Sequence, residues 1–463
     1  MVTYGLVSSM SALKTQRVTK NINIIGAGAS GLYTCFKLLQ LNKLNTPEDK
    51  VKLNINIWDK LPIPFGLVRN GVAPDHPEIK NCIDTFKEMF TDKSLYEDSV
   101  VKFVGNYNFT KLEEYQELIK KSDILYLANG CEQSRDYNLE NKTDSNILKA
   151  RDLVNWYNNY PESKSNQTPI WKTEEYWSKI KNINIVGNGN VAFDLCRLIS
   201  MCKYDKEAIN KSDINANFVD IIHQAPLKKI NIIGRRDFES AKFGSKEFRE
   251  LWGLSKYGVT GYINPKYFDH ITSISKPSRV LSKKIQLTKK NSTNIDNGNM
   301  KWELKFLQSP FKIDNGNKKL LSKENIMDVN NPAKPIQTDK IIEVDNDLVI
   351  LSIGTENPHM KELQQLMADN PQKISSVGWL KNKGFGTIAG TMLDTFAVVE
   401  KDYKNMDFLN NENSNELSDF EFLKNNKKLL TSWSDYEKIE QYEREVKNGK
   451  KCDSIEEMME VIH

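Results

Sequence analysis

A short run of β-branched residues followed by a glycine-rich loop opens the patterned part of the chain. Residues 21–25 (NINII) predict a strand, the loop GAGASG occupies 26–31, and a helical pattern continues through Leu41. A second strand is predicted over 53–58 and ends at the acidic residue Asp59. The order strand, helix, strand indicates a β-α-β unit whose first turn is made of glycines.

The same order returns near the middle of the chain. The run NINIV at 182–186 leads into GNGNVA at 187–192, a helix through Met201 and a strand over 229–233. This strand ends in the sequence Gly-Arg-Arg, where the first unit ends in an acid. Two openings of the same kind predict an α/β protein with two nucleotide-binding units.

The rest of the sequence predicts strands, loops and helices outside these two units. Polar loops alternate with strand-like runs over 289–331, which indicates β-rich decoration outside the core. Residues 410–428 are of low complexity and predict a connection, and the tail after Trp433, rich in Glu and Lys, predicts a solvated surface helix. Further strands are expected at 123–128, 302–307 and 347–354, and a glycine turn followed by a helix is expected in 378–396.

Composition excludes several functions. The 463 residues suffice for two or three domains, and 39% hydrophobic residues allow a sizeable core. Lys and Arg total 65 against 61 Asp and Glu, a balance too even for a surface built to bind nucleic acid. No apolar run approaches the ~18 residues of a membrane span, so we expect a soluble or peripheral protein. The six cysteines include no CxxC and the five histidines no HExxH, so we expect no metal site.

The first 20 residues have the composition of a targeting segment. No Asp or Glu occurs before Glu48, and Lys14, Arg17 and Lys20 stand among Ser and Thr residues. Basic, hydroxyl-rich and acid-free leaders are typical of mitochondrial import, which predicts a transit peptide over 1–20. A frayed N-terminal tail is the alternative.

The first glycine loop has the spacing of a dinucleotide site. Gly26 permits the tight turn, Gly28 lets the backbone approach a pyrophosphate, and Gly31 lets helix and strand pack closely. The helix N-terminus supplies N–H groups and a positive dipole for the phosphates. Asp59 stands where a carboxylate accepts hydrogen bonds from the ribose of an adenosine.

The second loop differs where nucleotide specificity is decided. It carries Ala192 in place of the third glycine, and Arg235 and Arg236 follow the next strand. Two guanidinium groups offer bidentate hydrogen bonds to a 2′-phosphate, which a carboxylate would repel. The second site is therefore predicted to bind NADP(H) rather than NAD(H).

Two dinucleotide sites of different chemistry in one chain predict a flavoenzyme, in which FAD stays bound and NADPH exchanges. A dithiol reductase would need a cysteine pair beside the flavin, whereas Cys196 and Cys202 lie on the helix after the second loop, so this class is rejected. An NADPH-dependent flavin monooxygenase or oxidase and a non-catalytic nucleotide-binding redox sensor remain as alternatives.

Four longer stretches resemble the mitochondrial adrenodoxin reductase family. They are WDKLPIPFGLVRNGVAPDHPEIKN at 58–81, NVAFD at 190–194, GRR at 234–236 with KEFREL at 246–251, and GWLKNKGFGTIAGTMLDTF at 378–396. The resemblance runs from Asn21 to Val399. It implies two Rossmann-like, doubly wound, three-layer domains with the NADP-binding domain inserted into the FAD-binding domain. The expected boundaries are 21–131 with 355–463 for FAD, and 132–354 for NADP.

The resemblance also implies the site residues. The FAD site would be lined by Gly26, Gly28, Ser30, Gly31, Asp59, Leu67, Phe109, Trp379, Gly386, Thr387 and Ile388. The NADP site would be lined by Gly187, Asn188, Gly189, Asn190, Arg235, Arg236 and Glu247, with Gly386 at the nicotinamide end. His76 and Asp194 match positions near the redox centre and are the expected catalytic residues. The alternatives are a structural histidine and an aspartate that only caps or pairs.

One loop departs from the family pattern. The family usually has a Pro-Thr pair before the last glycine, where this chain has Lys383-Gly384-Phe385, and this leaves the shape of the loop open. A helix that starts at Gly386 would aim its N-terminal dipole at the pyrimidine edge of the flavin, where reduced flavin carries negative charge. An ordinary turn before a packing helix is the alternative.

The implied reaction carries electrons from NADPH through FAD, singly, to a [2Fe–2S] ferredoxin in mitochondrial iron–sulfur or haem metabolism, as in the ferredoxin/adrenodoxin–NADP⁺ reductases. We expect a monomer in the matrix or peripheral to the inner membrane, with no nucleic-acid partner. The stretch 276–290 holds six basic residues and no acid. Lys276, Arg279, Lys283 and Lys284 are therefore predicted to dock an acidic ferredoxin, and a solvated loop is the alternative.

Overall fold

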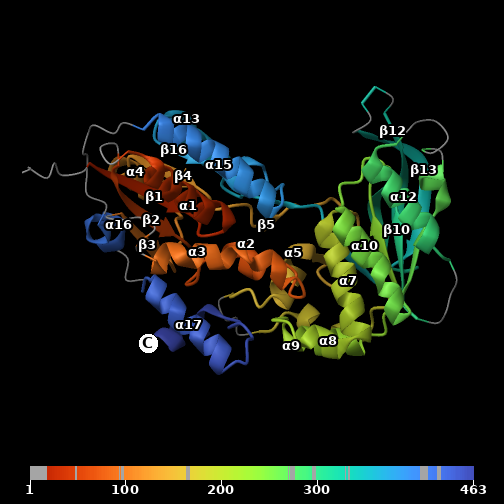
Figure 1. Ribbon diagram of the computed structural model, residues 1–463. Coiled ribbons are helices and arrows are strands. Elements are labelled where there is room, and N and C mark those ends of the chain that lie inside the picture. The colour runs from red at the N-terminus through yellow and green to blue at the C-terminus, as the bar shows by residue number, and fades with distance from the viewer. Residues whose placement is uncertain are drawn as a thin grey trace, which may run out of the picture.

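The computed structural model describes residues 18–46, 50–92, 94, 99–162, 167–269, 271, 277–294, 299–328, 330–331, 334–406, 416–424 and 429–463. Most of the predicted transit peptide (1–17), Lys276 and much of the low-complexity connection lie outside these residues. The described chain forms two lobes (Figure 1). We call the lobe built from the two ends of the sequence the first unit and the lobe built from its middle the second unit.

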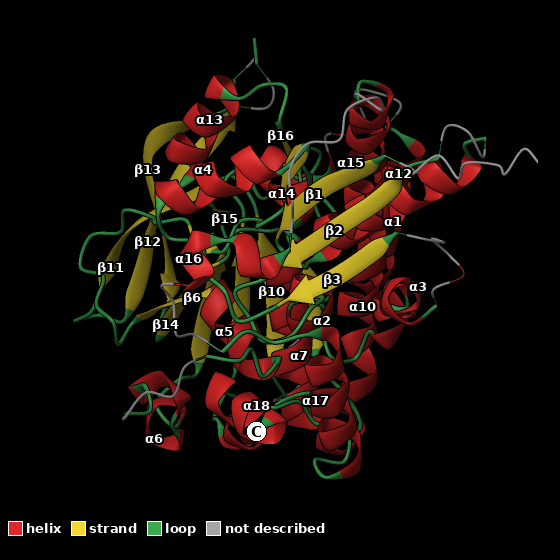
Figure 2. Cartoon of the chain, turned by 90° about the vertical axis from the view of Figure 1, so that its left-hand side faces the viewer, coloured by secondary structure: helices red, strands yellow, loops and turns green. Residues whose placement is uncertain are grey.

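The first unit is built on a parallel sheet in the order β16-β4-β1-β2-β3. The NINII run places Ile22 and Ile24 against one helix layer, while Asn23 on the other face accepts a hydrogen bond from the indole of Trp58 at 2.8 Å. Figure 2 shows β1, β2 and β3 side by side. The bounds are β1 Thr19–Ile25, β2 Lys52–Trp58, β3 Val100–Val104, β4 Ile124–Leu127 and β16 Ile374–Ser376.

Helices cover both faces of the first sheet. α1 and α15 lie side by side on one face and share a core with α3, α17 and α18, while α4 and α13 cover the other (Figure 1). No helix of the described residues is long and apolar enough to cross a membrane. The bounds are α1 Ala29–Leu44, α2 Gly66–Asn70, α3 Cys82–Thr91, α4 Leu112–Lys121, α13 Met360–Asp369, α14 Gly378–Lys381, α15 Ile388–Lys404, α16 Glu421–Lys424, α17 Trp433–Glu445 and α18 Ile455–Ile462.

The tail is part of the core, so the prediction of a solvated surface helix is wrong. Tyr436 and Ile439 of α17 and Met458 of α18 are buried within the first unit. Tyr436 packs edge-on against Phe65, with ring centroids 5.4 Å apart. Apart from the buried Glu443, most Glu and Lys residues of these helices lie on the outer side. Their number masks the helical spacing of the buried positions in the sequence.

The second unit is built on a parallel sheet in the order β6-β14-β7-β8-β10-β9. Its helices pack on one face, and the antiparallel sheet β11-β12-β13 covers the other. The strands are β6 Ile147–Lys149, β7 Asn182–Val186, β8 Lys229–Ile233, β9 Thr260–Ile263, β10 Lys301–Lys305, β11 Gln308–Asp314, β12 Lys319–Met327, β13 Pro335–Asp345 and β14 Leu348–Leu351. The helices are α5 Ala150–Tyr157, α6 Glu174–Trp177, α7 Asn190–Tyr204, α8 Lys206–Asn210, α9 Ala216–Gln224, α10 Ser245–Gly253 and α12 Arg279–Asn291.

β10 corrects a second prediction, because it is a core strand rather than decoration. It lies between β8 and β9 and pairs in parallel with both. Trp302 and Leu304 point into the helix-covered core and are almost completely buried. The alternating sequence of β10 resembles an edge strand, and its parallel partners are distant in sequence, so the local pattern could not place it. The β11-β12-β13 sheet that follows does lie outside the central sheet.

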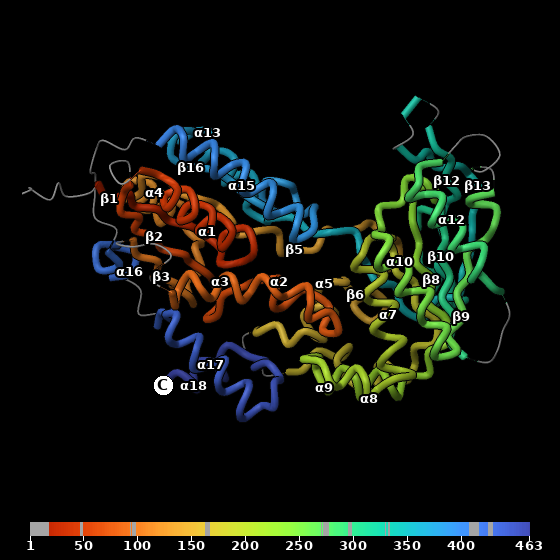
Figure 3. Tube along the Cα trace, viewed as in Figure 1, coloured from red at the N-terminus to blue at the C-terminus, as the bar shows by residue number. Residues whose placement is uncertain are grey.

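The chain crosses between the units along two neighbouring strands. β5 (Gln133–Ser134) leads out of the first unit, β15 (Thr355–Glu356) leads back, and the two pair antiparallel, with Thr355 opposite Ser134. Figure 3 shows β5 between the two units. We call β5 and β15 the connecting pair. The expected domain boundaries at 131/132 and 354/355 lie beside it and remain predictions.

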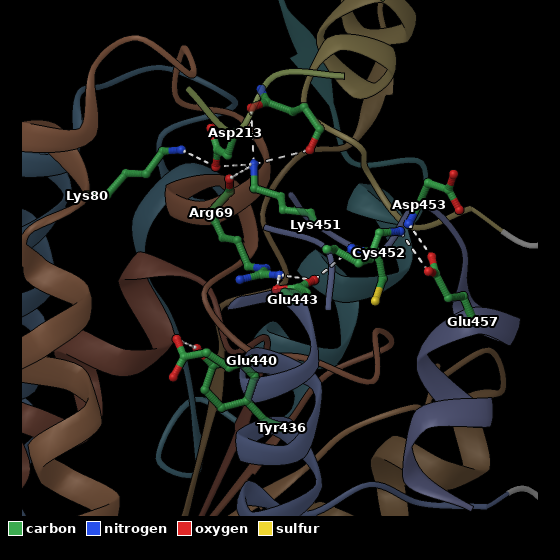
Figure 4. A network of polar contacts seen from close by, with 12 residues as sticks. Arg69, Lys80, Asp213, Tyr436, Glu440, Glu443, Lys451, Cys452, Asp453 and Glu457 are labelled. Atoms are coloured by element: carbon green, nitrogen blue, oxygen red, sulfur yellow. Dashed lines mark hydrogen bonds and ion pairs between the residues drawn. The ribbon is translucent and has the colours of Figure 1, made fainter. Parts of the chain in front are cut away.

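A buried polar network joins the tail to both units (Figure 4). Lys451 donates hydrogen bonds to the carbonyl oxygens of Arg69 at 2.9 Å and Asn158 at 3.2 Å, and its Nζ lies 2.9 Å from Asp213 Oδ2. The Nζ of Lys80 lies 2.9 Å from the same oxygen of Asp213. Arg69 also donates to Glu443 Oε1 at 2.6 Å. We call this group the C-terminal clasp; its members are Arg69, Lys80, Asn158, Asp213, Glu443 and Lys451.

Candidate active site

The first glycine turn lies where β1, β4 and α1 meet. Gly26 has φ +108°, and a Cβ there would lie 2.5 Å from the carbonyl oxygen of Ala128 after β4. A Cβ on Gly31 would lie 1.9 Å from the carbonyl oxygen of Gly26, so α1 packs directly on the turn. At Gly28, which precedes α1, a Cβ would meet no atom of the described residues within 4 Å. This open cradle at a helix N-terminus fits a phosphate group.

Asp59 holds the turn in place. Its Oδ2 accepts a hydrogen bond from the backbone N–H of Ala27 at 2.7 Å, and its Oδ1 accepts one from Leu61 at 2.9 Å. Burial raises the pKa of Asp59 to about 6, and the two N–H groups oppose this by favouring the carboxylate. A carboxylate has about four lone-pair sites, so two remain for the hydroxyls of a ribose.

A second helix N-terminus meets α1 at the same place. α15 begins after Gly386, which has φ +123°, and Thr387 caps it with its hydroxyl. A Cβ on Gly378 would lie 2.5 Å from Ser30 of α1 and 3.3 Å from Thr391 of α15, so the first turns of both helices approach Gly378. Neither of these fully described helices has an acidic residue in its first turn. Their positive ends therefore act together on one region, which suits a negatively charged group.

Trp379 and Leu67 lie beside this region. The Nε1 of Trp379 donates to the carbonyl oxygen of Gly386 at 3.2 Å. The backbone N–H of Phe65 donates to Ala27 of the glycine turn at 2.8 Å, which holds the start of α2, and with it Leu67, against the turn. Phe109 is placed differently, because it is buried in an aromatic cluster in which its ring centroid lies 5.5 Å from that of Trp58. A contact between Phe109 and FAD remains a prediction.

The second glycine turn repeats the geometry of the first. Gly187 has φ +115°, and a Cβ there would lie 2.1 Å from the carbonyl oxygen of Ser352 after β14. At Gly189, which precedes α7, a Cβ would meet none of the described atoms within 4 Å. The Nδ2 of Asn188 is buried without a hydrogen-bond partner among the described residues. A buried donor without a partner next to an open cradle fits an anionic ligand.

Asn190 connects this turn to α10. Its Oδ1 accepts a hydrogen bond from the backbone N–H of Gly244 at 2.8 Å, and its Nδ2 donates to Glu247 Oε1 at 3.0 Å. The predicted site residues Asn190 and Glu247 are therefore in direct contact. The segment 241–244 before α10 is held over the N-terminus of α7 by the same bonds.

Arg235 and Arg236 follow β8 directly after Gly234, whose backbone lies against the Asn188 side chain of the second turn. Their backbone is fixed, because Asn325 donates to the carbonyl oxygen of Arg235 at 2.7 Å and Leu307 to that of Arg236 at 3.1 Å. Arg235 is exposed and Arg236 half-buried. Neither guanidinium forms an ion pair with a carboxylate of the described residues. Two unpaired guanidiniums on a fixed backbone are available to a phosphate.

His76 and Asp194 lie in one cluster of charges between the two units. His76 Nε2 lies 3.1 Å from Glu250 Oε2, and Arg197 donates to Asp194 Oδ1 at 2.9 Å. Arg197 also pairs with Asp75 and lies 3.6 Å from Glu250. Burial raises the pKa of Asp194, and Arg197 acts against that shift. These ion pairs connect His76 to Asp194 through Glu250 and Arg197. A catalytic role for the two residues remains a prediction.

Sequence reasoning missed several members of the site. Arg197 and Glu250 stand on helices among other charged residues and gave no separate signal, although the spacing of Asp194 and Arg197 fits a pair one helical turn apart. Thr391 was missed because its approach to Ser30 and Gly378 joins segments that are distant in sequence.

The basic stretch predicted to dock a partner forms α12. Arg279 and Lys283 are exposed, while Leu281 and Ile285 are buried. Lys284 is turned inward: its Nζ donates to the carbonyl oxygen of Phe243 at 2.9 Å and lies 4.1 Å from the centroid of the Phe243 ring. Burial lowers the pKa of Lys284. Of the four predicted docking residues, Arg279 and Lys283 are thus the exposed ones on α12, and docking itself remains a prediction.

Relatives of known name match almost the whole chain. The chain is 31% identical to the "Probable NADPH:adrenodoxin oxidoreductase, mitochondrial" of Saccharomyces cerevisiae, over 95% of this chain and 94% of that protein. It is 29% identical to the protein of the same name from Schizosaccharomyces pombe, over 96% and 94%. It is 26% identical to the NADPH:adrenodoxin oxidoreductase of Homo sapiens, over 82% and 78%. The scan against protein-family models found no match.

Solved structures show the same fold. FprA of Mycobacterium tuberculosis, solved in complex with NADPH, superposes with a TM-score of 0.76 at 22% identity and covers 96% of this chain and 99% of its own. The predicted α/β fold with two Rossmann-like units is confirmed. The predicted family is confirmed as well, since a relative 31% identical spans nearly all of both chains. The chain belongs to the mitochondrial NADPH:adrenodoxin oxidoreductase family.

Proposed function

We propose that this chain is a mitochondrial FAD-dependent NADPH:ferredoxin oxidoreductase, which passes electrons from NADPH through FAD, singly, to a [2Fe–2S] ferredoxin. The observation that carries the proposal is a difference in charge between the residues that accompany the two glycine turns. Asp59 follows the strand after the first, and Arg235 and Arg236 follow the strand after the second. Two dinucleotides of different charge fit such a pair of sites, and the relatives are named for NADPH and adrenodoxin.

The first unit holds FAD in this proposal. The backbone at Gly28 and the N-terminus of α1 bind the pyrophosphate, and Asp59 accepts hydrogen bonds from the ribose. The N-terminus of α15, from Gly386 to Ile388, faces the pyrimidine edge and stabilises negative charge there. FAD, when bound, supplies the exchange between a two-electron hydride donor and a one-electron acceptor.

The second unit selects and binds NADPH. The backbone at Gly189 and the N-terminus of α7 bind the pyrophosphate, with the free donor of Asn188 beside them. Arg235 and Arg236 bind the 2′-phosphate and so exclude NADH from tight binding. Asn190 and Glu247 keep the segment 241–244 in place over this end of the site.

His76 and Asp194 act at the junction between the units. Their charge cluster ties the segment after α2 to α7 and α10, so it fixes the position of the nicotinamide-binding unit relative to the flavin-binding unit. Hydride transfer depends on such positioning more than on acid–base groups. The role proposed for both residues is to position the redox centre through Glu250 and Arg197.

The carrier partner is an acidic ferredoxin that docks on the basic face of α12, through Arg279 and Lys283 together with Lys276. The chain acts as a monomer in the matrix or peripheral to the inner membrane, within the ferredoxin/adrenodoxin–NADP⁺ reductase class. Opposite charge on carrier and reductase speeds their encounter at low salt, which suits a short-lived electron-transfer complex.

An anaerobic titration tests the proposal. The purified protein is titrated with NADPH while the visible absorbance of the flavin is recorded, and a [2Fe–2S] ferredoxin is then added with cytochrome c as final acceptor. We expect the yellow colour to bleach and to return when ferredoxin is added. Rapid reoxidation by air but not by ferredoxin would instead identify an oxidase or monooxygenase. A colourless protein, or a yellow one that NADPH does not bleach, would identify a redox sensor.

A further inference from the structure

The loop before Gly386 presents an aromatic ring on a rigid backbone. Phe385 is 55% exposed. Lys383 and Gly384 have φ +54° and +81°, and the carbonyl oxygen of Lys383 accepts a hydrogen bond from Arg135 at 2.9 Å. A Cβ on Gly384 would lie 2.5 Å from the carbonyl oxygen of Thr355 in the connecting pair. The loop is therefore fixed against the place where the chain crosses between the units.

Two cations from different parts of the molecule meet this ring. The guanidinium carbon of Arg135, directly after β5, lies 5.3 Å from the centroid of the Phe385 ring. The Nζ of Lys242, in the segment before α10 of the second unit, lies 5.5 Å from the same centroid. Both distances lie within the ~6 Å over which a cation is attracted to an aromatic face. Phe385 thus links the first unit to the second through contacts that are individually weak and can open.

The contact lies between the two ends of the proposed NADPH site. Lys242 belongs to the segment 241–244, whose Gly244 is hydrogen-bonded to Asn190 at the pyrophosphate end. Phe385 directly precedes Gly386 at the nicotinamide end. The contact between Phe385 and Lys242 therefore connects the segment at one proposed end of the site to the segment at the other.

We propose that Phe385 is a positioning residue for NADPH. Its contacts with Lys242 and Arg135 close over the nicotinamide half of the bound nucleotide and slow the release of that nucleotide. The inference rests on the proposed function, since it requires NADPH at the second turn. The family pattern carries a Pro-Thr pair in this loop and offers no ring there, so the closure belongs to the residues of this chain.

The test compares two ligands that differ only in the part facing Phe385. NADP⁺ contains the nicotinamide half, whereas adenosine 2′,5′-bisphosphate contains only the half bound by Arg235 and Arg236. For Phe385→Ala we expect the dissociation rate of NADP⁺, measured by stopped flow, to rise about fivefold, and that of the bisphosphate to stay within about twofold. Phe385→Tyr retains the ring and should release NADP⁺ at the wild-type rate.

Lys242→Gln provides a second route to the same result if Phe385→Ala folds poorly. It removes one cation without changing the loop and should speed the release of NADP⁺ but not that of the bisphosphate. Lys381→Gln is the control, because Lys381 is an exposed lysine four residues before Phe385, and it should leave both rates unchanged. Unchanged or slower release of NADP⁺ in both Phe385→Ala and Lys242→Gln, or equal acceleration for both ligands, would overturn the inference. Failure of the proposed function is a separate result, because it appears as a wild-type flavin that NADPH does not bleach.

Discussion

Neighbouring glycines in the two turns are required for opposite reasons. At Gly26 and Gly187 the space for a side chain is already filled by the carbonyl groups of Ala128 and Ser352, and φ is positive. At Gly28 and Gly189 the space is open and φ is negative, −79° and −86°. The first position of each turn therefore serves the fold, and the second keeps room for a ligand.

This difference predicts unlike effects for two similar substitutions. Gly187→Ala should lower the melting temperature strongly, because its methyl group would lie 2.1 Å from the carbonyl oxygen of Ser352. Gly189→Ala should melt like the wild type but bind NADP⁺ at least about tenfold more weakly, since its methyl group occupies the place of the pyrophosphate. Thermal melting and NADP⁺ titration measure the two effects. Normal affinity in Gly189→Ala would remove the pyrophosphate from this turn.

The arginines after β8 predict a loss that depends on the nucleotide. Arg235→Ala with Arg236→Ala should raise KM for NADPH by about tenfold for each arginine, because each charge-assisted bond to the 2′-phosphate contributes roughly 1.5–3 kcal/mol. KM for NADH should hardly change, since NADH has no such phosphate. Arg249→Ala, an exposed arginine on α10, is the matched control. Equal losses for both nucleotides would show that the arginines are structural.

Among the elements, α12 shows how helical packing limits the number of basic side chains that face solvent. Its buried residues Leu281, Ile285 and Thr288 recur with the helical period, so the remaining basic residues are divided between solvent and protein. Lys284 donates a hydrogen bond to the carbonyl oxygen of Phe243, and the Nζ of Lys289 lies 3.8 Å from Asp269 Oδ1. The positive charge that α12 presents to a partner is therefore smaller than the number of basic residues in the stretch suggests.

Charge reversal on the exposed side of α12 tests docking. Arg279→Glu with Lys283→Glu should lower ferredoxin-dependent reduction of cytochrome c about tenfold at low ionic strength, and the difference should shrink at high salt. Reduction of ferricyanide, which needs no docking surface, should stay within about twofold. Lys181→Glu with Lys211→Glu makes the same change of charge on other exposed positions and should have no such effect. If both double variants behave alike, ferredoxin docks elsewhere.

Elements that depend on local sequence could be predicted, and elements that depend on distant partners could not. β1, α1 and β2, and likewise β7, α7 and β8, were predicted because each combines an apolar run with a glycine turn. β10 was misjudged because its partners β8 and β9 are separate in sequence. In the site, the glycine turns and Arg235 follow from local spacing. The pairing of His76 with Glu250 and the approach of Thr391 to Ser30 require the folded chain.

At the scale of the whole molecule, the units are joined covalently by the connecting pair and non-covalently by the charge cluster around Arg197 and by the C-terminal clasp. α17, which carries Glu443 of the clasp, lies away from β5 in Figure 1 and away from β15 in Figure 2. In addition, Lys450 donates to the carbonyl oxygens of Asn210 at 2.9 Å and Ile214 at 3.3 Å in the second unit. The tail therefore holds the units together on the side where the chain does not cross between them.

Lys451→Met tests the strength of the clasp. The substitution keeps an unbranched side chain of similar length but leaves the carbonyl oxygens of Arg69 and Asn158 without this donor. We expect the free energy of unfolding to fall by roughly 2–4 kcal/mol, because each buried acceptor that loses its partner costs about 1–3 kcal/mol. Hydrogen exchange should also become faster at 211–214 and 447–452. Lys438→Met, an exposed lysine on α17, is the control, and equal stability of both variants would contradict a structural role.

The insertion of the second unit into the first also orders events during synthesis. All strands of the second sheet lie between Ile147 and Leu351, so this sheet has its full sequence while the first sheet still lacks β16. Until Ile374–Ser376 has been made, the ILYL strand β4 is an unpaired apolar edge of the kind that associates with other chains. Lys451 follows still later. The first sheet therefore cannot be completed until the whole second unit has been synthesised. Until then, β4 is the exposed edge that a chaperone would have to cover.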